Sequence, residues 1–206
     1  MAREGTPASA ARHRPVRGGP QPATVLQLKV TLRGVRPPIW RRLQIESNGT
    51  LAKLHAALQI TFAWEDSHLH EFQVGERRFG RPDVEDGLAE PGETENENGT
   101  TLSQAMRRKG AKLLYVYDFG DSWEHEVVVE DIVAAEPTVR YPRCLDGRRA
   151  APPEDCGGAW GYAELLRVLS DPTHEEHAER LEWLGDAFDP ERFDLAAANR
   201  SLARVR

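Results

Sequence analysis

Apolar and polar residues alternate along the stretch TVLQLKVTLRGVRPPIWRRLQIES, which begins at Thr24. A period of two is typical of strands that bury one face. The pattern predicts one strand over Val25–Leu32 and a second over Ile39–Ile45, with a turn at Gly34–Pro38 between them. An antiparallel hairpin is therefore the expected start of the folded domain.

The spacing then changes to that of a helix. Leu51, Leu54 and Leu58 form an inward stripe behind Thr50, a residue type that caps helix N-termini. Strand signals return in LHEFQVGERRFG, a predicted hairpin around Gly75. The stretch AKLLYVYDFGDSWEHEVVVEDIV predicts two long strands about a tight turn, in which Gly120 supplies a positive φ.

Helical signals dominate the end of the chain. Thr101 and Gln104 form a capping box for a short helix that reaches Arg108, and two further helices are predicted over Tyr162–Leu169 and Thr173–Leu184. A second capping box is predicted at Thr173 and Glu176, and Asp189–Pro190 is the expected start of a last helix. Residues 141–161 are rich in Pro and Gly and are expected to be irregular. The fold class is α+β: a mostly antiparallel sheet built from hairpins, one helix after the first hairpin and a helical C-terminal third.

A length of 206 residues fits one domain and a tail. Residues 1–22 hold Arg, Pro, Gly and Ala without periodicity and are predicted to be a disordered basic tail. Residues 23–206 form the single predicted domain, and residues 82–100 are an expected acidic, flexible loop within it. Cys144 and Cys156 are too few for a disulfide scaffold, which favours a reducing cytoplasm. No apolar run is long enough for a membrane span.

The formal net charge of -6 argues against a general nucleic-acid surface. Nucleic acid could be contacted only by the basic tail and by local arginine patches. These patches are Arg41–Arg42, Arg77–Arg78, Arg107–Lys109 and Arg148–Arg149.

Histidines on apolar faces are the main chemical signal. Beyond the DFGDS turn, Trp123 and His125 share a strand face with valines, whereas glutamates occupy the other face. In WEDSHLHEF, His68 and His70 share a face with Phe72 if the strand starts near His68. A buried imidazole needs a hydrogen-bond partner. The aspartates at the adjoining strand ends are the expected partners: Asp66, Asp118 and Asp121.

Three interpretations of this cluster stay open. The residues form a buried structural network, a small-molecule or peptide pocket, or a metal site. The pocket would use Trp64 and Trp123 for apolar contact and the His and Asp side chains for orientation. A metal site would use His68, His70 and His125, with Asp118 or Asp121 as fourth ligand or base, and would allow hydrolysis by a metal-bound water. No cofactor motif is present; a divalent metal is the one conceivable cofactor.

Five ordered blocks resemble the plasmid pRiA4b ORF-3-like family. They are LKVTLRGVRPPIWRRLQI, WEDSHLHEF, YDFGDSWEHEV, YPRCLDGRRA with PPEDCGGAWGY, and FDPERFDL, and together they span about residues 24–200. The resemblance implies a compact α+β domain and, by association, a link to mobile elements, but no defined activity. We therefore expect a cytoplasmic binding or accessory module; a metal-assisted hydrolase and a nucleic-acid accessory protein are the alternatives.

Overall fold

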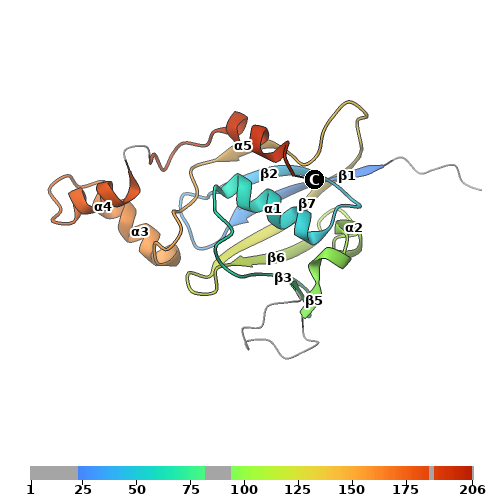
Figure 1. The fold of residues 1–206 in the computed structure, drawn as a ribbon, viewed down its shortest axis with the longest axis horizontal. Coiled ribbons are helices and arrows are strands. Elements are labelled where there is room, and N and C mark those ends of the chain that lie inside the picture. The colour runs from blue at the N-terminus through green and yellow to red at the C-terminus, as the bar shows by residue number, and fades with distance from the viewer. Residues whose placement is uncertain (1–22, 82–93, 186–187, 206) are drawn as a thin grey trace, which may run out of the picture.

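The structure is a computed structural model that describes residues 23–81, 94–185 and 188–205. Its centre is one eight-stranded sheet (Figure 1). All neighbouring strands are antiparallel except β4 and β5, which confirms the expected mostly antiparallel α+β fold. The spatial order is β5 (Thr94–Asn96), β4 (Arg77–Gly80), β3 (His70–Val74), β6 (Lys112–Tyr117), β7 (Trp123–Ala134), β1 (Thr24–Leu32), β2 (Trp40–Glu46) and β8 (Arg143–Arg148).

One sheet face carries the hydrophobic core. Alternate residues of β1 point into it, and α1 (Leu51–Phe62) lies across the same face (Figure 1). The predicted leucine stripe of α1 is fully buried, and the Thr50 hydroxyl accepts a hydrogen bond from the Lys53 amide as the cap requires. Burial of each such leucine stabilises the fold by about 1.5–3 kcal/mol.

The opposite face of the sheet carries paired charges. Arg42 on β2 makes two hydrogen bonds to Glu130 on β7, and Arg33 and Lys112 pair with Glu124 and Glu126. The arginine patch predicted at Arg41–Arg42 is thus divided between the two faces, because adjacent strand residues point in opposite directions. Arg41 lies on the core side and is 1% exposed.

Five helical segments follow α1 in the described part of the chain. The 3-10 helix η1 spans Glu97–Gly99, and α2 (Leu102–Ala105) has the predicted Thr101–Gln104 capping box but ends before Arg108. The helix α3 spans Gly158–Leu169. The prediction of a Thr173–Glu176 capping box was wrong: α4 spans His177–Leu184, and Thr173 donates its hydroxyl to Asp171 instead.

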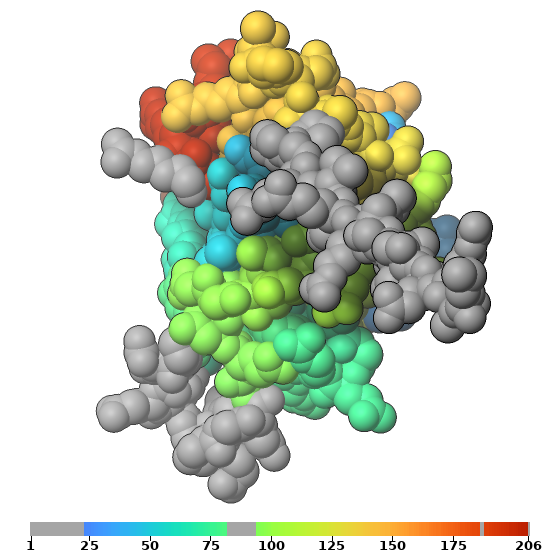
Figure 2. Space-filling model, turned by 90° about the vertical axis from the view of Figure 1, so that its right-hand side faces the viewer, coloured from blue at the N-terminus to red at the C-terminus, as the bar shows by residue number. Residues whose placement is uncertain are grey.

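The last helix also starts later than predicted. α5 spans Leu195–Leu202 and is capped by Asp194. Asp189 instead lies in a local turn, where its side chain accepts the Glu191 amide and its carbonyl accepts the Arg192 amide. Strand β8 was missed within the supposedly irregular residues 141–161. In Figure 2 the red C-terminal segment lies beside the gold segment that follows β7, in agreement with the contacts between α5 and β8.

Two predicted segments lie wholly or partly outside the described residues. The basic tail, residues 1–22, lies wholly outside them, and so do residues 82–93 of the acidic segment. The remaining residues of that segment form β5, η1 and Thr100, and Glu97 among them is buried. No helix in the described part of the chain is long and apolar enough to cross a membrane.

Candidate functional site

A turn after β6 forms one side of the candidate site. Asp118 has a φ of 58°, and its Oδ1 accepts the amides of Gly120 at 2.8 Å and Asp121 at 3.3 Å. The Ser122 amide donates to the Asp118 carbonyl, and Ser122 also has a positive φ. The prediction that Gly120 supplies the positive φ was therefore wrong, since Asp tolerates the left-handed region when its side chain bonds locally.

His68 faces this turn from the segment before β3. Its Nε2 lies 3.8 Å from Oδ2 of Asp118 and 3.3 Å from Oδ1 of Asp155. The Nε2 atom is buried, yet no described residue gives it a hydrogen bond. We call His68, Asp118 and Asp155 the corner triad; one ligand atom from each lies within 4.8 Å of the others.

Asp155 reaches the triad on a loop that is fixed to the turn. The Gly157 amide donates to Oδ2 of Asp121 at 3.2 Å, and a Cβ on Gly158 would lie 2.6 Å from the Asp121 carbonyl oxygen. The Trp64 indole donates to the Pro152 carbonyl at 3.0 Å at the other end of the loop. The turn and the Trp64 segment thus both hold the Asp155 loop, which precedes α3.

The backbone at the corner adopts an uncommon conformation at two of the triad residues. Asp118 and Asp155 both have a φ of 58°. Non-glycine residues with positive φ are uncommon, and they persist where the surrounding structure enforces them, often at functional sites. Two of the three triad residues are held in this way.

An aromatic cluster supports the corner from the core side. Trp64 stacks on Tyr117 with 4.9 Å between ring centroids and lies 6.1 Å from Trp123. The Tyr117 hydroxyl donates to Glu154 and accepts the Ser67 amide, which ties the His68 segment to the Asp155 loop. Burial and the nearby Glu154 carboxylate raise the pKa of Tyr117 well above its usual value, so the hydroxyl stays protonated.

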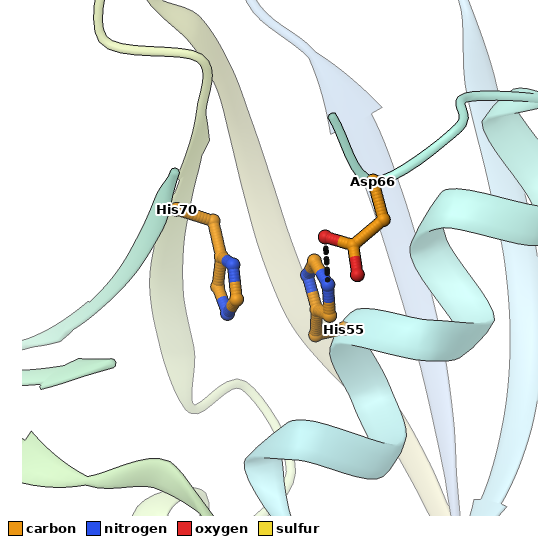
Figure 3. A group of neighbouring side chains, drawn as sticks. All are labelled: His55, Asp66 and His70. Atoms are coloured by element: carbon orange, nitrogen blue, oxygen red, sulfur yellow. Dashed lines mark hydrogen bonds and ion pairs between the residues drawn. The ribbon is translucent and has the colours of Figure 1, made fainter. Parts of the chain in front are cut away.

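His70 belongs to a different group. Its ring stacks on His55 of α1, with 3.6 Å between centroids and 9° between planes, and Figure 3 shows the two rings face to face. Nε2 of His70 lies 2.7 Å from Oε2 of the buried Glu97. His55 contacts the Tyr115 hydroxyl at 2.8 Å and Asp66 at 2.9 Å. Burial lowers the pKa of His55 to about 4, so its ring is neutral near pH 7.

His125 lies within the aromatic core. Its ring makes edge contacts with Phe62 and Trp64, and its Nδ1 lies 3.0 Å from the Trp123 carbonyl. Burial lowers the pKa of His125 to about 3. The alternating burial of β7 confirms the predicted face of Trp123 and His125.

The three histidines predicted as metal ligands therefore do not form one set. Among the described residues, His68 belongs to the corner triad, His70 lies with His55 and Asp66 in a second group, and His125 lies in neither. The reason is geometric, because His68 precedes β3 and the regular alternation begins only at His70.

Sequence reasoning missed three important residues. His55 could have been found, since it lies four residues after Leu51 and three before Leu58 on the buried face of α1. Glu97 follows an acidic stretch that predicts solvent exposure, and Asp155 lies in a Pro- and Gly-rich segment. The sequence around these two residues does not indicate which histidine each of them faces.

The fold and the corner define an α+β protein with one open, mostly antiparallel sheet, and with a polar site where two irregular loops meet. The chain belongs to the plasmid pRiA4b ORF-3-like protein family, whose model matches residues 24–197. It is 43% identical over 180 residues to the uncharacterized protein y4hQ of Sinorhizobium fredii, which covers 87% of this chain and 88% of that protein. It also resembles the crystal structure of a protein of unknown function, MM3350 from Methanosarcina mazei Go1. The TM-score is 0.77 at 40% identity, over 85% of this chain and 96% of the other.

Proposed function

We propose that the protein is a binding module for a divalent metal ion, held by the corner triad. One observation carries this proposal: the buried Nε2 of His68 faces two carboxylate oxygens and has no hydrogen-bond partner among the described residues. A buried polar atom without a partner is costly, and a bound ion would satisfy it.

The donor set determines the kind of ion. One imidazole nitrogen and two carboxylates suit Mn²⁺, Fe²⁺ or Zn²⁺ better than the soft ions that prefer sulfur. Cys156 follows Asp155 in the chain, but its thiol is not part of the group of ligand atoms that lie within 4.8 Å of one another. The corner triad therefore offers one nitrogen and two carboxylate ligands, a set that suits Mn²⁺ or Zn²⁺.

The second group is less suited to a metal. Both ring nitrogens of His55 have partners, and Asp66 also pairs with Arg81 at 2.5 Å. An ion there would have to break an existing network. This favours the structural-network interpretation for His55, Asp66 and His70, and the binding interpretation for the corner.

Three protein ligands leave open coordination positions on an ion. Metal-assisted hydrolysis is therefore the second function that the corner supports, since a water on such an ion ionises more readily. Nucleic-acid binding has weaker support, because Arg77, Arg78 and Arg149 pair with Glu95, Glu71 and Glu191. A cytoplasmic location and a link to mobile elements remain parts of the proposal.

The test is a titration of untagged, chelator-treated protein with MnCl₂ and ZnCl₂, followed by calorimetry. We expect one site per chain in the wild type. Asp155→Asn keeps a residue that tolerates positive φ but removes the charge, and should weaken binding about tenfold or more. His68→Gln should do the same. Glu175→Gln, an exposed glutamate far along the chain in the segment before α4, is the control of equal charge change and should bind as the wild type does.

A separate variant distinguishes the two groups. If His70→Gln removes binding while Asp155→Asn retains it, the ion lies in the His55 group and the proposal is wrong. No binding of either ion by the wild type would also end it.

A further inference from the structure

A second site lies in a cleft of about 500 Å³ on the core side of β2. Its walls come from the end of α1, the segment of residues 150–153, the end of α4 and the first turns of α5. The walls are mostly apolar, with aromatic rings from Phe62, Trp183, Phe188 and Phe193. None of the corner triad lines the cleft, so this site is independent of the proposed metal site.

One cation lies in this apolar wall. The Arg41 guanidinium lines the cleft and is stacked between Phe193, 3.9 Å from its ring centroid, and Phe62, at 4.9 Å. Its Nε donates to the Thr61 carbonyl at 2.7 Å, and its Nη1 to two further carbonyls at 2.9 Å. Within the described residues, Nη2 makes no hydrogen bond and no carboxylate lies within 4.0 Å of the guanidinium.

A glycine on the neighbouring strand leaves room for the Arg41 side chain. Gly147 on β8 is the cross-strand neighbour of Arg41. A Cβ on Gly147 would lie 2.5 Å from the Phe193 ring and 2.9 Å from Cδ of Arg41. The absence of a side chain at this position lets the ring and the guanidinium approach each other.

A buried cation without a counter-ion is unfavourable, and the cost is relieved when an anion binds beside it. Burial accordingly lowers the pKa of Arg41 to about 10, which still leaves it charged at neutral pH. The acidic side chain on the wall, Asp194, is already used, since it caps α5 by accepting the Ala197 amide. Exposed Arg192 adds a second positive charge at the wall.

These features define the ligand by its chemistry. The aromatic walls favour a flat apolar body, and the volume falls within the range of small-molecule sites. The remaining Nη2 group favours a carboxylate, with which an arginine forms strong charge-assisted hydrogen bonds. We propose that the cleft binds a small aromatic carboxylate, whose charged group pairs with Arg41 and whose ring lies against the aromatic walls.

The test uses two probes of nearly the same shape, the anionic 1-naphthylacetate and the neutral 1-naphthylacetamide, each titrated into the full chain by calorimetry. We expect the carboxylate to bind about tenfold or more tightly than the amide. Arg41→Gln should remove this preference and leave the affinity for the amide unchanged.

Because Arg41 also makes three hydrogen bonds within the fold, a second pair of variants keeps it intact. Ala197→Leu fills the cleft from α5, and Ala196→Leu adds the same volume at the exposed neighbour outside the cleft wall. Ala197→Leu should weaken both probes about tenfold or more, and Ala196→Leu should weaken neither.

Three results would overturn the proposal. They are equal affinity of the wild type for the two probes, no binding of either probe up to about 1 mM, and equal loss of affinity in Ala196→Leu and Ala197→Leu. The metal titration of the corner triad is unaffected by any of these results.

Discussion

The rings of His55 and His70 lie parallel, with 3.6 Å between their centroids, and each is bonded to a different carboxylate. His55 links α1 to Asp66, and His70 links β3 to Glu97 just after β5. The stacked pair therefore connects the helix to the β5 edge of the sheet. This arrangement favours the structural-network interpretation of the pair, because each ring already contacts a carboxylate.

We predict that Glu97→Ala destabilises the protein by about 2–4 kcal/mol, since it leaves the buried His70 Nε2 without its partner. The free energy of unfolding from urea titration measures this effect. Glu95→Ala, two residues earlier, is the matched control: Glu95 is exposed and pairs with exposed Arg77, so its loss should leave the urea midpoint nearly unchanged. Equal effects of the two substitutions would show that the buried His70–Glu97 contact adds no more to the free energy of unfolding than the exposed pair does.

Stability should depend on pH through the buried histidines. The pKa of His125 is about 3 in the folded protein and 6.5 in its ordinary state. Above pH 6.5 neither folded nor unfolded protein binds the proton, so the full stability is present. As the pH falls below 6.5, His125 binds a proton in the unfolded chain but not in the folded chain. Stability therefore falls by about 1.4 kcal/mol per pH unit for this histidine.

His125→Phe isolates this contribution. The substitution keeps an aromatic ring against Phe62 and Trp64 but cannot be protonated. Between pH 6 and pH 4, the difference in unfolding free energy between variant and wild type should shift in favour of the variant by about 1.4 kcal/mol per unit. The carboxylates titrate alike in both proteins and cancel. A pH-independent difference would show that His125 is not kept neutral by burial.

Much of the sheet could be predicted because a period of two leaves few alternatives. The faces of β1 and β7 follow directly from their alternation, and so does the burial of His125. Strand β8 was missed because RCLDGR contains a glycine and a charged residue where alternation expects apolar ones. Its glycine is required by the approach of Phe193, a contact between segments 46 residues apart that no local pattern contains.

The positions of some candidate residues could be predicted for the same reason. His68 Nε2 lies 3.8 Å from Oδ2 of Asp118, because the two residues adjoin the ends of the neighbouring strands β3 and β6. Asp155 and Glu97 are delivered by irregular segments whose positions depend on tertiary contacts. The local pattern indicates that a histidine is buried. Its partner, however, comes from a segment distant in the sequence, which the pattern does not identify.

Gly158 should be essential for the corner. Its φ is +67°, and an added Cβ would lie 2.6 Å from the Asp121 carbonyl oxygen. We predict that Gly158→Ala costs about 2–4 kcal/mol and weakens Mn²⁺ binding, because the Asp155 loop must move away from the turn. Gly110→Ala is the control: its φ is +79°, but no described residue lies within 4 Å of an added Cβ, so only backbone strain of about 1 kcal/mol is expected. Similar losses in both variants would exclude close loop contact as the cause.

The approach of Arg41 to Phe193 can be tested with a double-mutant cycle at Gly147. The backbone of Gly147 has an ordinary φ, so Gly147→Ala acts only through the clash with the Phe193 ring and Cδ of Arg41. We expect a loss of about 1–3 kcal/mol in unfolding free energy. Phe193→Leu shortens the clashing side chain, so the same glycine substitution should cost about 1 kcal/mol less in that background. Additive losses would show that Gly147 does not make room for the ring, and that the Arg41–Phe193 stack forms independently of this glycine.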